Sequence, residues 1–158
     1  MCPLRAPAKA PSAALRVSHL GICVSDLPRS LAFYRDALGF AVESELRVEG
    51  EPSETLLRLE GVRLHAVYLV RDGLRIELLH YASPGHVGDG SPRAMNRLGL
   101  THLSLRVEDL DATLASLEAR GARVLRETRI DNAQLRAKAV FATDPDGTLI
   151  ELVDAKPR

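Results

Sequence analysis

Apolar and polar side chains alternate from residue 17 to residue 24, where the chain reads VSHLGICV. This period of two predicts a β-strand with one covered face. After the strand the period lengthens, and Asp26 is placed to cap a helix that Gly39 ends. The apolar stripe of this helix consists of Leu27, Leu31, Tyr34 and Leu38. Further strands are predicted at 41–48, 62–71 and 74–81, with a turn at Asp72-Gly73 between the last two.

The same order of elements occurs a second time. HLGICVSDL from His19 aligns without gaps on HLSLRVEDL from His102, and DGLRIELL from Asp72 aligns on DGTLIELV from Asp146. The first offset is 83 residues and the second is 74, so the first copy carries nine extra residues, within itself or in a longer linker. The second copy predicts a helix from Asp109 to Gly121, with the stripe Leu110, Leu114 and Leu117, and strands at 122–128, 137–143 and 147–153.

The repeat predicts an α+β fold of two tandem βαβββ modules. Pro, Gly and Ser concentrate between the two copies, as is typical of a linker. The expected organisation is a tail at 1–16, module one at 17–82, a linker at 83–99, module two at 100–154 and a short tail at 155–158.

Composition narrows the classes of partner. The 158-residue chain has 21 basic and 21 acidic side chains, so it lacks the strongly basic surface that nucleic-acid binding needs. Cys2 and Cys23 do not form a disulfide framework, which favours a reducing compartment. The Ala- and Pro-rich tail lacks the apolar core of a secretory signal, and no apolar run approaches the roughly 20 residues of a membrane span. We therefore expect a cytoplasmic protein with a small-molecule partner and no nucleic-acid or membrane partner.

Each module places one histidine and one glutamate on the strand face turned away from its helix. Because strand side chains alternate between faces, His19 and Cys23 lie opposite Ile22, which is expected to pack on the helix. By the same count Glu77 lies opposite Ile76. The corresponding residues of module two are His102 and Glu151.

Two such sheets, packed as pseudo-symmetric halves, would direct these four side chains into one hollow. Without a cation, two carboxylates in a partly desolvated cavity repel, and each unpaired buried charge costs several kcal/mol. Singly, each residue has an ordinary structural explanation, but the repetition in both modules favours a shared metal site. The predicted ligands are His19, Glu77, His102 and Glu151.

From Val17 to Asp154 the sequence resembles the vicinal oxygen chelate superfamily, which contains glyoxalase I, methylmalonyl-CoA epimerase, fosfomycin-resistance enzymes, extradiol dioxygenases and bleomycin-resistance proteins. The stretches HLGICVSDLPRSLAFYRDALGF and ATDPDGTLIELVD carry the similarity. The resemblance implies paired βαβββ modules that form a cup around one divalent metal ion. It places the ligand positions of the family on the same four residues.

The resemblance leaves the class of enzyme open. Glutathione-dependent glyoxalase I usually has Arg and Asn where this chain has Cys23 and Tyr81, and methylmalonyl-CoA epimerase commonly has Gln where Glu77 stands. Extradiol dioxygenases take two histidines and one carboxylate from a single module, and bleomycin-binding relatives generally lack the metal set. The leading expectation is an isomerase or lyase of the glyoxalase or epimerase type. The alternatives are an Fe-dependent dioxygenase or aromatic-tailoring oxygenase, and a non-catalytic ligand-binding or resistance protein.

Two imidazoles and two carboxylates around a divalent ion sum to zero charge and leave positions open for substrate oxygens. Such nitrogen and oxygen sites accept Zn, Ni, Co, Fe or Mn. The hypothesis is a substrate that chelates the metal through two neighbouring oxygens, an enolate stabilised by a Lewis acid, and a carboxylate that moves a proton. Similarity to glyoxalase I favours Glu151 as this base, with Glu77 as second choice.

Other positions on the same faces are candidates for substrate binding. Cys23 shares the His19 face, Tyr81 shares the Glu77 face, and Arg106 shares the His102 face. Arg106 suits an anionic group and Tyr81 an aromatic one. The remaining histidines have no counterpart in the other module and are expected to be structural or exposed: His65, His80 and His86. By family resemblance the chain is expected to form a homodimer, with each cup formed within one chain or across two.

Overall fold

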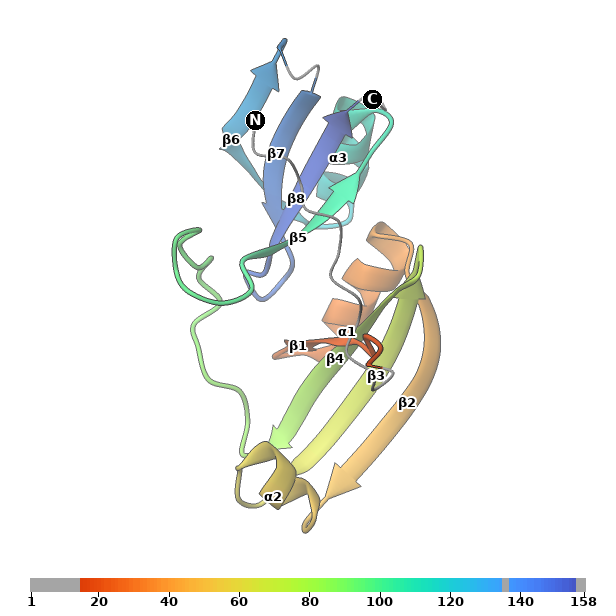
Figure 1. The fold of residues 1–158 in the computed structure, drawn as a ribbon, viewed down its shortest axis with the longest axis vertical. Helices are drawn as coiled ribbons and strands as arrows, with labels where there is room; N and C mark the ends of the chain where they lie inside the picture. Colours follow the sequence, from red (N-terminus) through yellow and green to blue (C-terminus); the bar gives the residue numbers. More distant parts are fainter. Residues whose placement is uncertain (1–14, 135–136, 156–158) are drawn as a thin grey trace.

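The computed structural model of the chain describes residues 15–134 and 137–155. Two four-stranded sheets follow one another along the sequence, each with a helix after its first strand (Figure 1). The first module contains β1 (Leu20–Cys23), α1 (Leu27–Leu31) continuing into the π-helical η1 (Ala32–Ala37), β2 (Ala41–Glu49), α2 (Ser53–Leu57), β3 (Arg63–Arg71) and β4 (Leu74–Ser83). The second contains β5 (His102–Arg106), α3 (Leu110–Ala119), β6 (Arg123–Asn132), β7 (Ala137–Thr143) and β8 (Leu149–Ala155).

The two sheets have the same topology. Their strand orders are β1-β4-β3-β2 and β5-β8-β7-β6, and in each the first strand runs parallel to the last while the other neighbours are antiparallel. The α+β fold of tandem βαβββ modules predicted from the internal repeat is confirmed. The parallel pairing matters for the site, because it places the histidine-bearing segment of each module beside the strand that carries its glutamate.

The predicted helix caps are present in both modules. The carboxylate of Asp26 accepts the N–H of Arg29 at 2.9 Å, and that of Asp109 accepts the N–H of Ala112 at the same distance. The first helix nevertheless differs from a regular α-helix. From Ala32 its turns widen, as the bond from the N–H of Leu38 to the carbonyl of Phe33 shows. Phe33, which the 3.6-residue period had not assigned to the apolar stripe, lies in this widened segment and is buried.

Helix α2 accounts for the nine extra residues of the first copy. The connection from β2 to β3 runs over 50–62, whereas that from β6 to β7 runs over 133–136, so the extra length lies inside the module and not in the linker. Sequence patterning predicted no helix there. Leu57 of α2 and the following Leu59 pack with Tyr81 on a small separate core of three buried residues: Val62, Leu64 and Ala66.

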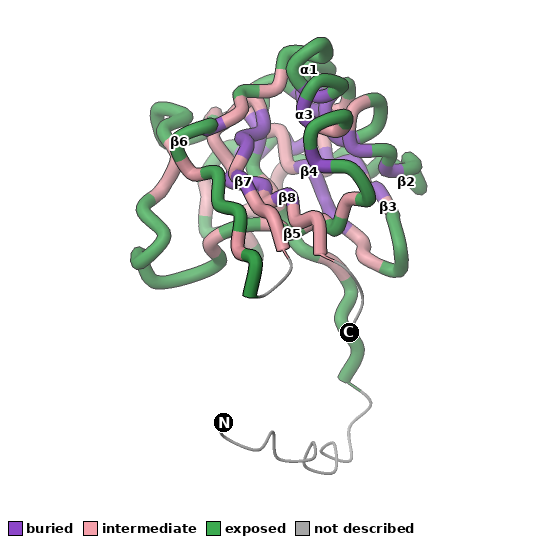
Figure 2. The backbone as a smooth tube through the Cα atoms, turned by 90° about the horizontal axis from the view of Figure 1, so that it is seen from above, coloured by how far each residue is buried: buried purple, intermediate pink, exposed green. Residues whose placement is uncertain are grey.

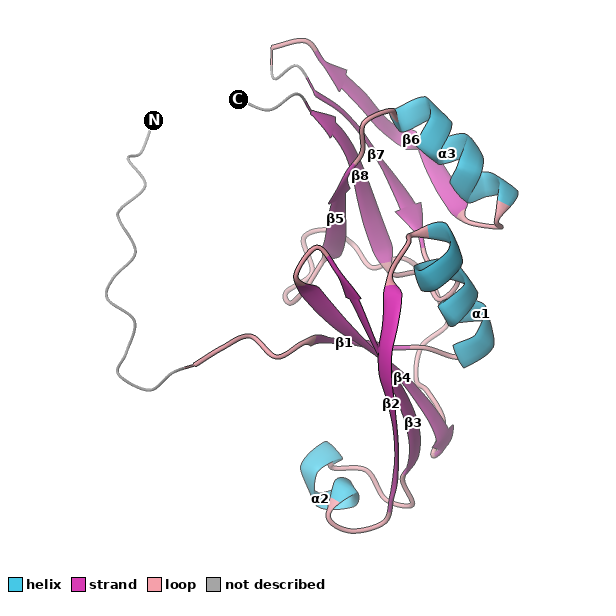
Figure 3. Cartoon of the chain, turned by 90° about the vertical axis from the view of Figure 1, so that its right-hand side faces the viewer, coloured by secondary structure: helices cyan, strands magenta, loops and turns pink. Residues whose placement is uncertain are grey.

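The main core is continuous across the two modules. Buried leucines of the first helix segment and of α3 belong to one apolar cluster with side chains of β3, β4, β7 and β8. Figure 3 shows both helices on the same side of the molecule, and Figure 2 shows buried residues in the strands and helices that contribute to this cluster. Each fully buried Leu or Ile in it contributes roughly 1.5–3 kcal/mol to folding. Among the described residues, no helix is long and apolar enough to cross a membrane.

Polar contacts also join the modules, at the turn between β7 and β8. The hydroxyl of Tyr34 donates to the buried carboxylate of Asp144 at 2.8 Å. Asp146 accepts the Ser25 hydroxyl at 2.5 Å, and its Oδ1 lies 2.8 Å from the guanidinium of Arg29. The start of the first helix is thus fixed to the turn of the second sheet.

A matched pair of glycines tests how closely the linker packs on this turn. Gly73 and Gly147 occupy equivalent positions in the repeat and both have positive φ, at 80° and 84°. A Cβ on Gly147 would collide with the backbone of Gly90, whereas one on Gly73 would meet nothing within 4 Å. Gly73→Ala should therefore cost about 1 kcal/mol of unfolding free energy, and Gly147→Ala about 2–4 kcal/mol. Urea unfolding of both variants measures the difference, and equal losses would contradict the close packing.

Candidate metal centre

The first histidine–glutamate pair lies at the edge of the first sheet. His19 directly precedes β1, and Glu77 on β4 is the register partner of Gly21. The Nε2 atom of His19 lies 2.9 Å from Oε2 of Glu77, whose side chain is only 10% exposed. Ile76 and Leu78, on either side of Glu77, belong to the main core, so alternation along β4 directs the carboxylate to the opposite face.

Hydroxyl and aromatic groups surround this pair. The Ser18 hydroxyl lies 3.0 Å from Nδ1 of His19, and the ring of Tyr68 meets the imidazole edge-on with centroids 5.4 Å apart. The pKa of the Tyr68 phenol is raised, first by its hydrogen bond to Glu77 and then by burial. The phenol therefore stays protonated beside the carboxylate.

The second pair repeats this arrangement in module two. Nε2 of His102 lies 3.6 Å from Oε2 of Glu151, and the Thr101 hydroxyl lies 2.9 Å from Nδ1 of His102. Phe141 meets the imidazole edge-on with centroids 5.4 Å apart, as Tyr68 does in module one. The hydroxyl of Ser104 donates to the same Oε2 atom of Glu151 at 2.6 Å.

The donor chemistry of both pairs fits a divalent ion. Each offers an imidazole Nε2 and a carboxylate oxygen on the face that its sheet turns away from the helix. A hydroxyl oxygen beside Nδ1 can accept the Nδ1–H of the tautomer that leaves Nε2 unprotonated for a metal ion. Together the pairs would supply two nitrogens and two carboxylates, the mixture that Zn, Ni, Co, Fe and Mn accept.

The structure brings the predicted ligands together two by two, and not as four. Among residues 15–134 and 137–155 of one chain, no three His, Cys, Asp or Glu side chains are close enough to hold one ion. The sequence left open whether each cup forms within one chain or across two, and in this chain the two pairs stay separate. Register within a sheet fixes each pair, but the separation of the pairs depends on how the two sheets pack, and β1 and β5 are not hydrogen-bonded to each other.

Cys23, one of the expected substrate contacts, borders a cavity of about 340 Å³ between the first strand of module one and module two. The free edge of β1, the start of β5 and the β7–β8 turn line this cavity, and His102 is part of its wall. Leu20, which alternation places on the same strand face as Ile22, is 36% exposed and also lines this cavity. Partial burial and the Asp146 carboxylate raise the pKa of the Cys23 thiol, so the residue offers a neutral S–H to a ligand.

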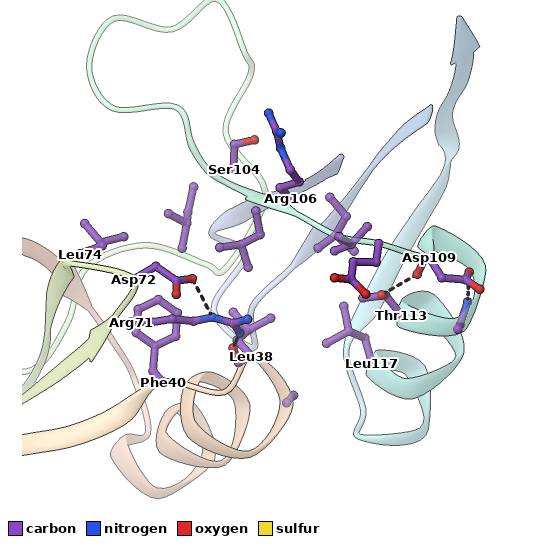
Figure 4. Close-up of a pocket in the computed structure, with 17 residues that line it drawn as sticks. Leu38, Phe40, Arg71, Asp72, Leu74, Ser104, Arg106, Asp109, Thr113 and Leu117 are labelled. Carbon is purple, nitrogen blue, oxygen red and sulfur yellow. Dashed lines mark hydrogen bonds and ion pairs between the residues drawn. The ribbon is translucent and has the colours of Figure 1, made fainter. Parts of the chain in front are cut away.

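The other two expected substrate contacts lie apart from one another. Tyr81 packs on the small core beneath α2, and its pKa is raised by burial first and then by the neighbouring Cys23 and Glu77. Arg106 borders a larger cavity of about 700 Å³ between the modules. Figure 4 shows its side chain and that of Ser104 directed away from the apolar residues of that cavity. Alternation along β5 places both on the face that carries His102.

Sequence reasoning missed the groups that surround the two pairs. A hydroxyl residue before each histidine, Ser18 and Thr101, is visible in the repeat and could have been recognised there. Tyr68 and Phe141 become apparent only from the strand register, because each lies directly opposite a glutamate on the neighbouring strand. Ser104 occupies the place of Gly21, so comparison of the copies alone gave no reason to select it.

Known proteins share this architecture. The chain is 31% identical over 139 residues to YaeR of Escherichia coli (strain K12), covering 88% of this chain and 95% of that protein. It is 32% identical to an ethylmalonyl-CoA/methylmalonyl-CoA epimerase of Cereibacter sphaeroides, with 87% and 96% covered. It is also 32% identical to a probable lactoylglutathione lyase of Synechocystis sp. (strain PCC 6803), with 89% and 95% covered.

A solved structure supports the same fold. The glyoxalase family protein of Bacillus cereus superposes with a TM-score of 0.80 at 24% identity, covering 95% of this chain and all of that one. The sequence model of the Glyoxalase/Bleomycin resistance protein/Dioxygenase superfamily matches residues 16–152, which include both histidine–glutamate pairs. With this match over most of its length, the chain belongs to that family, the vicinal oxygen chelate superfamily.

Proposed function

We propose that the protein is a divalent-metal-dependent isomerase or lyase that acts on a small substrate with two neighbouring oxygens. The observation that carries the proposal is the duplicated histidine–glutamate pair, with Nε2 and Oε2 2.9 Å apart in one module and 3.6 Å apart in the other. Two relatives about one-third identical over nearly the whole chain, an epimerase and a probable lactoylglutathione lyase, bear names of the same reaction classes.

A complete set of four ligands requires the pair of module one to face a pair of module two. Because the pairs stay apart within one chain, we place the site between two chains of a homodimer, with His19 and Glu77 of one protomer facing His102 and Glu151 of its partner. The charges of two carboxylates and one divalent ion sum to zero. The ion therefore removes the repulsion between the carboxylates in a desolvated site.

The bound metal would supply Lewis-acid stabilisation of negative charge on the substrate oxygens. The remaining chemistry belongs to side chains of this protein. Glu151 removes and returns a proton on the carbon next to the substrate carbonyl, and Glu77 holds the opposite side of the site. Cys23 and Arg106 contact the substrate beyond the reacting carbon, and Tyr81 forms an apolar wall near Glu77.

Metal analysis of anaerobically purified protein, followed by assays with defined substrates, tests this proposal. The substrates are methylmalonyl-CoA, ethylmalonyl-CoA and the hemithioacetal of methylglyoxal with glutathione, in deuterated water and with an oxygen electrode. We expect Zn, Ni, Co or Mn to support deuterium exchange or product formation without O₂ uptake. Tightly held Fe with O₂ uptake would overturn the proposal in favour of an oxygenase, and ligand binding without turnover would overturn it in favour of a binding protein.

A further inference from the structure

The two histidine–glutamate pairs differ in the hydroxyl that lies near each glutamate. In module one it belongs to Tyr68 on β3, the register partner of Glu77, whereas its counterpart Phe141 has none. In module two it comes from Ser104 on β5, whose counterpart is Gly21. Each glutamate thus has a hydroxyl nearby, but from a different strand of its sheet.

The donors are not interchangeable. A Cβ on Gly21 would lie 3.1 Å from Cδ1 of Leu79, so module one has little room for a serine at that position. Tyr68 is held on both sides, by the edge-on contact with His19 and by the guanidinium of Arg75, which lies 4.0 Å from the ring centroid. The Tyr68 ring is therefore held in place, while a serine hydroxyl turns about a single bond and can adjust to its acceptor.

Distances show the effect of Ser104 on its glutamate. The Oε2 atom of Glu151 that accepts the Ser104 hydroxyl at 2.6 Å stands 3.6 Å from Nε2 of His102. In module one, with glycine in place of this serine, the same two atom types are 2.9 Å apart. Charge-assisted O–H···O contacts of this length are strong. Ser104 therefore competes with His102 for the carboxylate oxygen.

The two glutamate side chains also differ in solvent exposure. The Glu77 side chain is 10% exposed, and that of Glu151 is 28% exposed. One glutamate is enclosed between an imidazole and a rigid phenol, and the other has a longer imidazole contact and more room to move.

From this difference we infer that Ser104 is a positioning residue that holds Glu151 off His102 and keeps it available for proton transfer, while Glu77, paired closely with His19, is the permanent ligand. The inference rests on the proposed function and assigns unequal tasks to two glutamates that the repeat alone presents as equivalent. Ser104 acts through Glu151 and needs no contact with the substrate.

Imidazole nitrogen NMR of metal-free, ¹⁵N-labelled protein tests the positioning independently of catalysis. In Ser104→Ala, the released Oε2 atom can pair with His102, so the His102 ring signals should move toward those of His19. Ser104→Thr keeps the hydroxyl and should leave them in place. Tyr68→Phe serves as the matched control and should shift the His19 signals but not those of His102. Unmoved His102 signals in Ser104→Ala would overturn the inference.

Kinetics of the metal-loaded protein test the assigned tasks. Loss of a hydrogen bond to a charged group predicts a roughly tenfold lower kcat for Ser104→Ala with KM nearly unchanged, and recovery in Ser104→Thr. An unchanged kcat in Ser104→Ala, in a protein whose wild type turns over, would overturn the assignment of Glu151 as the proton-transferring carboxylate. A wild type inactive with every substrate would instead count against the proposed function, and the NMR result would still decide the role of Ser104.

Discussion

Glu151→Gln should lower kcat by about a hundredfold to ten-thousandfold, the range typical for loss of a general base. Glutamine keeps the shape of the side chain and an oxygen that can still accept the Ser104 hydroxyl, now 2.6 Å from Oε2. It cannot take a proton from carbon, because the amide is not basic. Steady-state kinetics with the substrate identified in the deuterium-exchange assay measures the loss.

Metal content separates a missing base from a missing ion. Each Glu151→Gln preparation should be analysed for bound metal beside wild type and Glu77→Gln. Because Glu77 is the more buried carboxylate and lies 2.9 Å from its histidine, its removal should release more metal than removal of Glu151. Near-normal turnover by metal-loaded Glu151→Gln would refute its role as base.

The same two variants show where the site is assembled. If each cup takes one pair from each protomer, a dimer of one Glu77→Gln chain and one Glu151→Gln chain contains one intact site and one doubly altered site. Random mixing of two inactive proteins should then restore about a quarter of wild-type activity per chain. Cups formed within single chains would give no recovery after mixing, and this outcome would exclude the interprotomer arrangement.

Local rules were sufficient to predict most of the fold. Alternation and helical spacing identified the strands and the two helices, and the Asp26 and Asp109 caps have the predicted contacts. Internal repetition added the tandem arrangement, because two copies of one pattern fold by the same local preferences. Within a module, the parallel pairing of the first and last strands was not predicted; the structure supplies it, and it brings each histidine beside its glutamate.

What escaped prediction depends on packing between segments. Helix α2 is short, and Leu57 and Leu59 pack it against a small core that the periodicity of the sequence does not predict. The π-helical widening at the buried Phe33 has no marker in the apolar spacing. The separation of the two pairs is set by the contact between modules, so patterns within one strand carry no information about it.

Substitution of Asp144 should have the second large effect, a loss of stability. Its buried carboxylate accepts the Tyr34 hydroxyl at 2.8 Å and the N–H groups of Asp146 and Thr148 at 2.9 and 2.7 Å. Asp144→Ala removes the acceptor of three polar groups at the junction of the two modules. At about 1 kcal/mol or more for each unsatisfied group, the variant should lose at least about 3 kcal/mol of unfolding free energy. Urea titration followed by circular dichroism measures the loss.

Asparagine at the same position separates the hydrogen bonds from the charge. In Asp144→Asn the amide oxygen can still accept both N–H groups, while the amide nitrogen donates to the Tyr34 oxygen, so the loss should be much smaller than in Asp144→Ala. A loss as large as that of alanine would show that the charge, and not the hydrogen bonding, stabilises the junction.

The unfolding free energies of wild type and Asp144→Asn should depend differently on pH. Burial raises the pKa of the Asp144 carboxyl, with hydrogen bonds from Tyr34 and Thr148 opposing the shift. The folded protein therefore binds this proton more tightly than the unfolded chain does. The resulting stabilisation is fully present below the unfolded pKa of about 4 and is lost as pH rises through the folded pKa. Wild type should accordingly gain unfolding free energy relative to Asp144→Asn as pH falls from 7 toward 4, and a difference independent of pH would contradict the raised pKa.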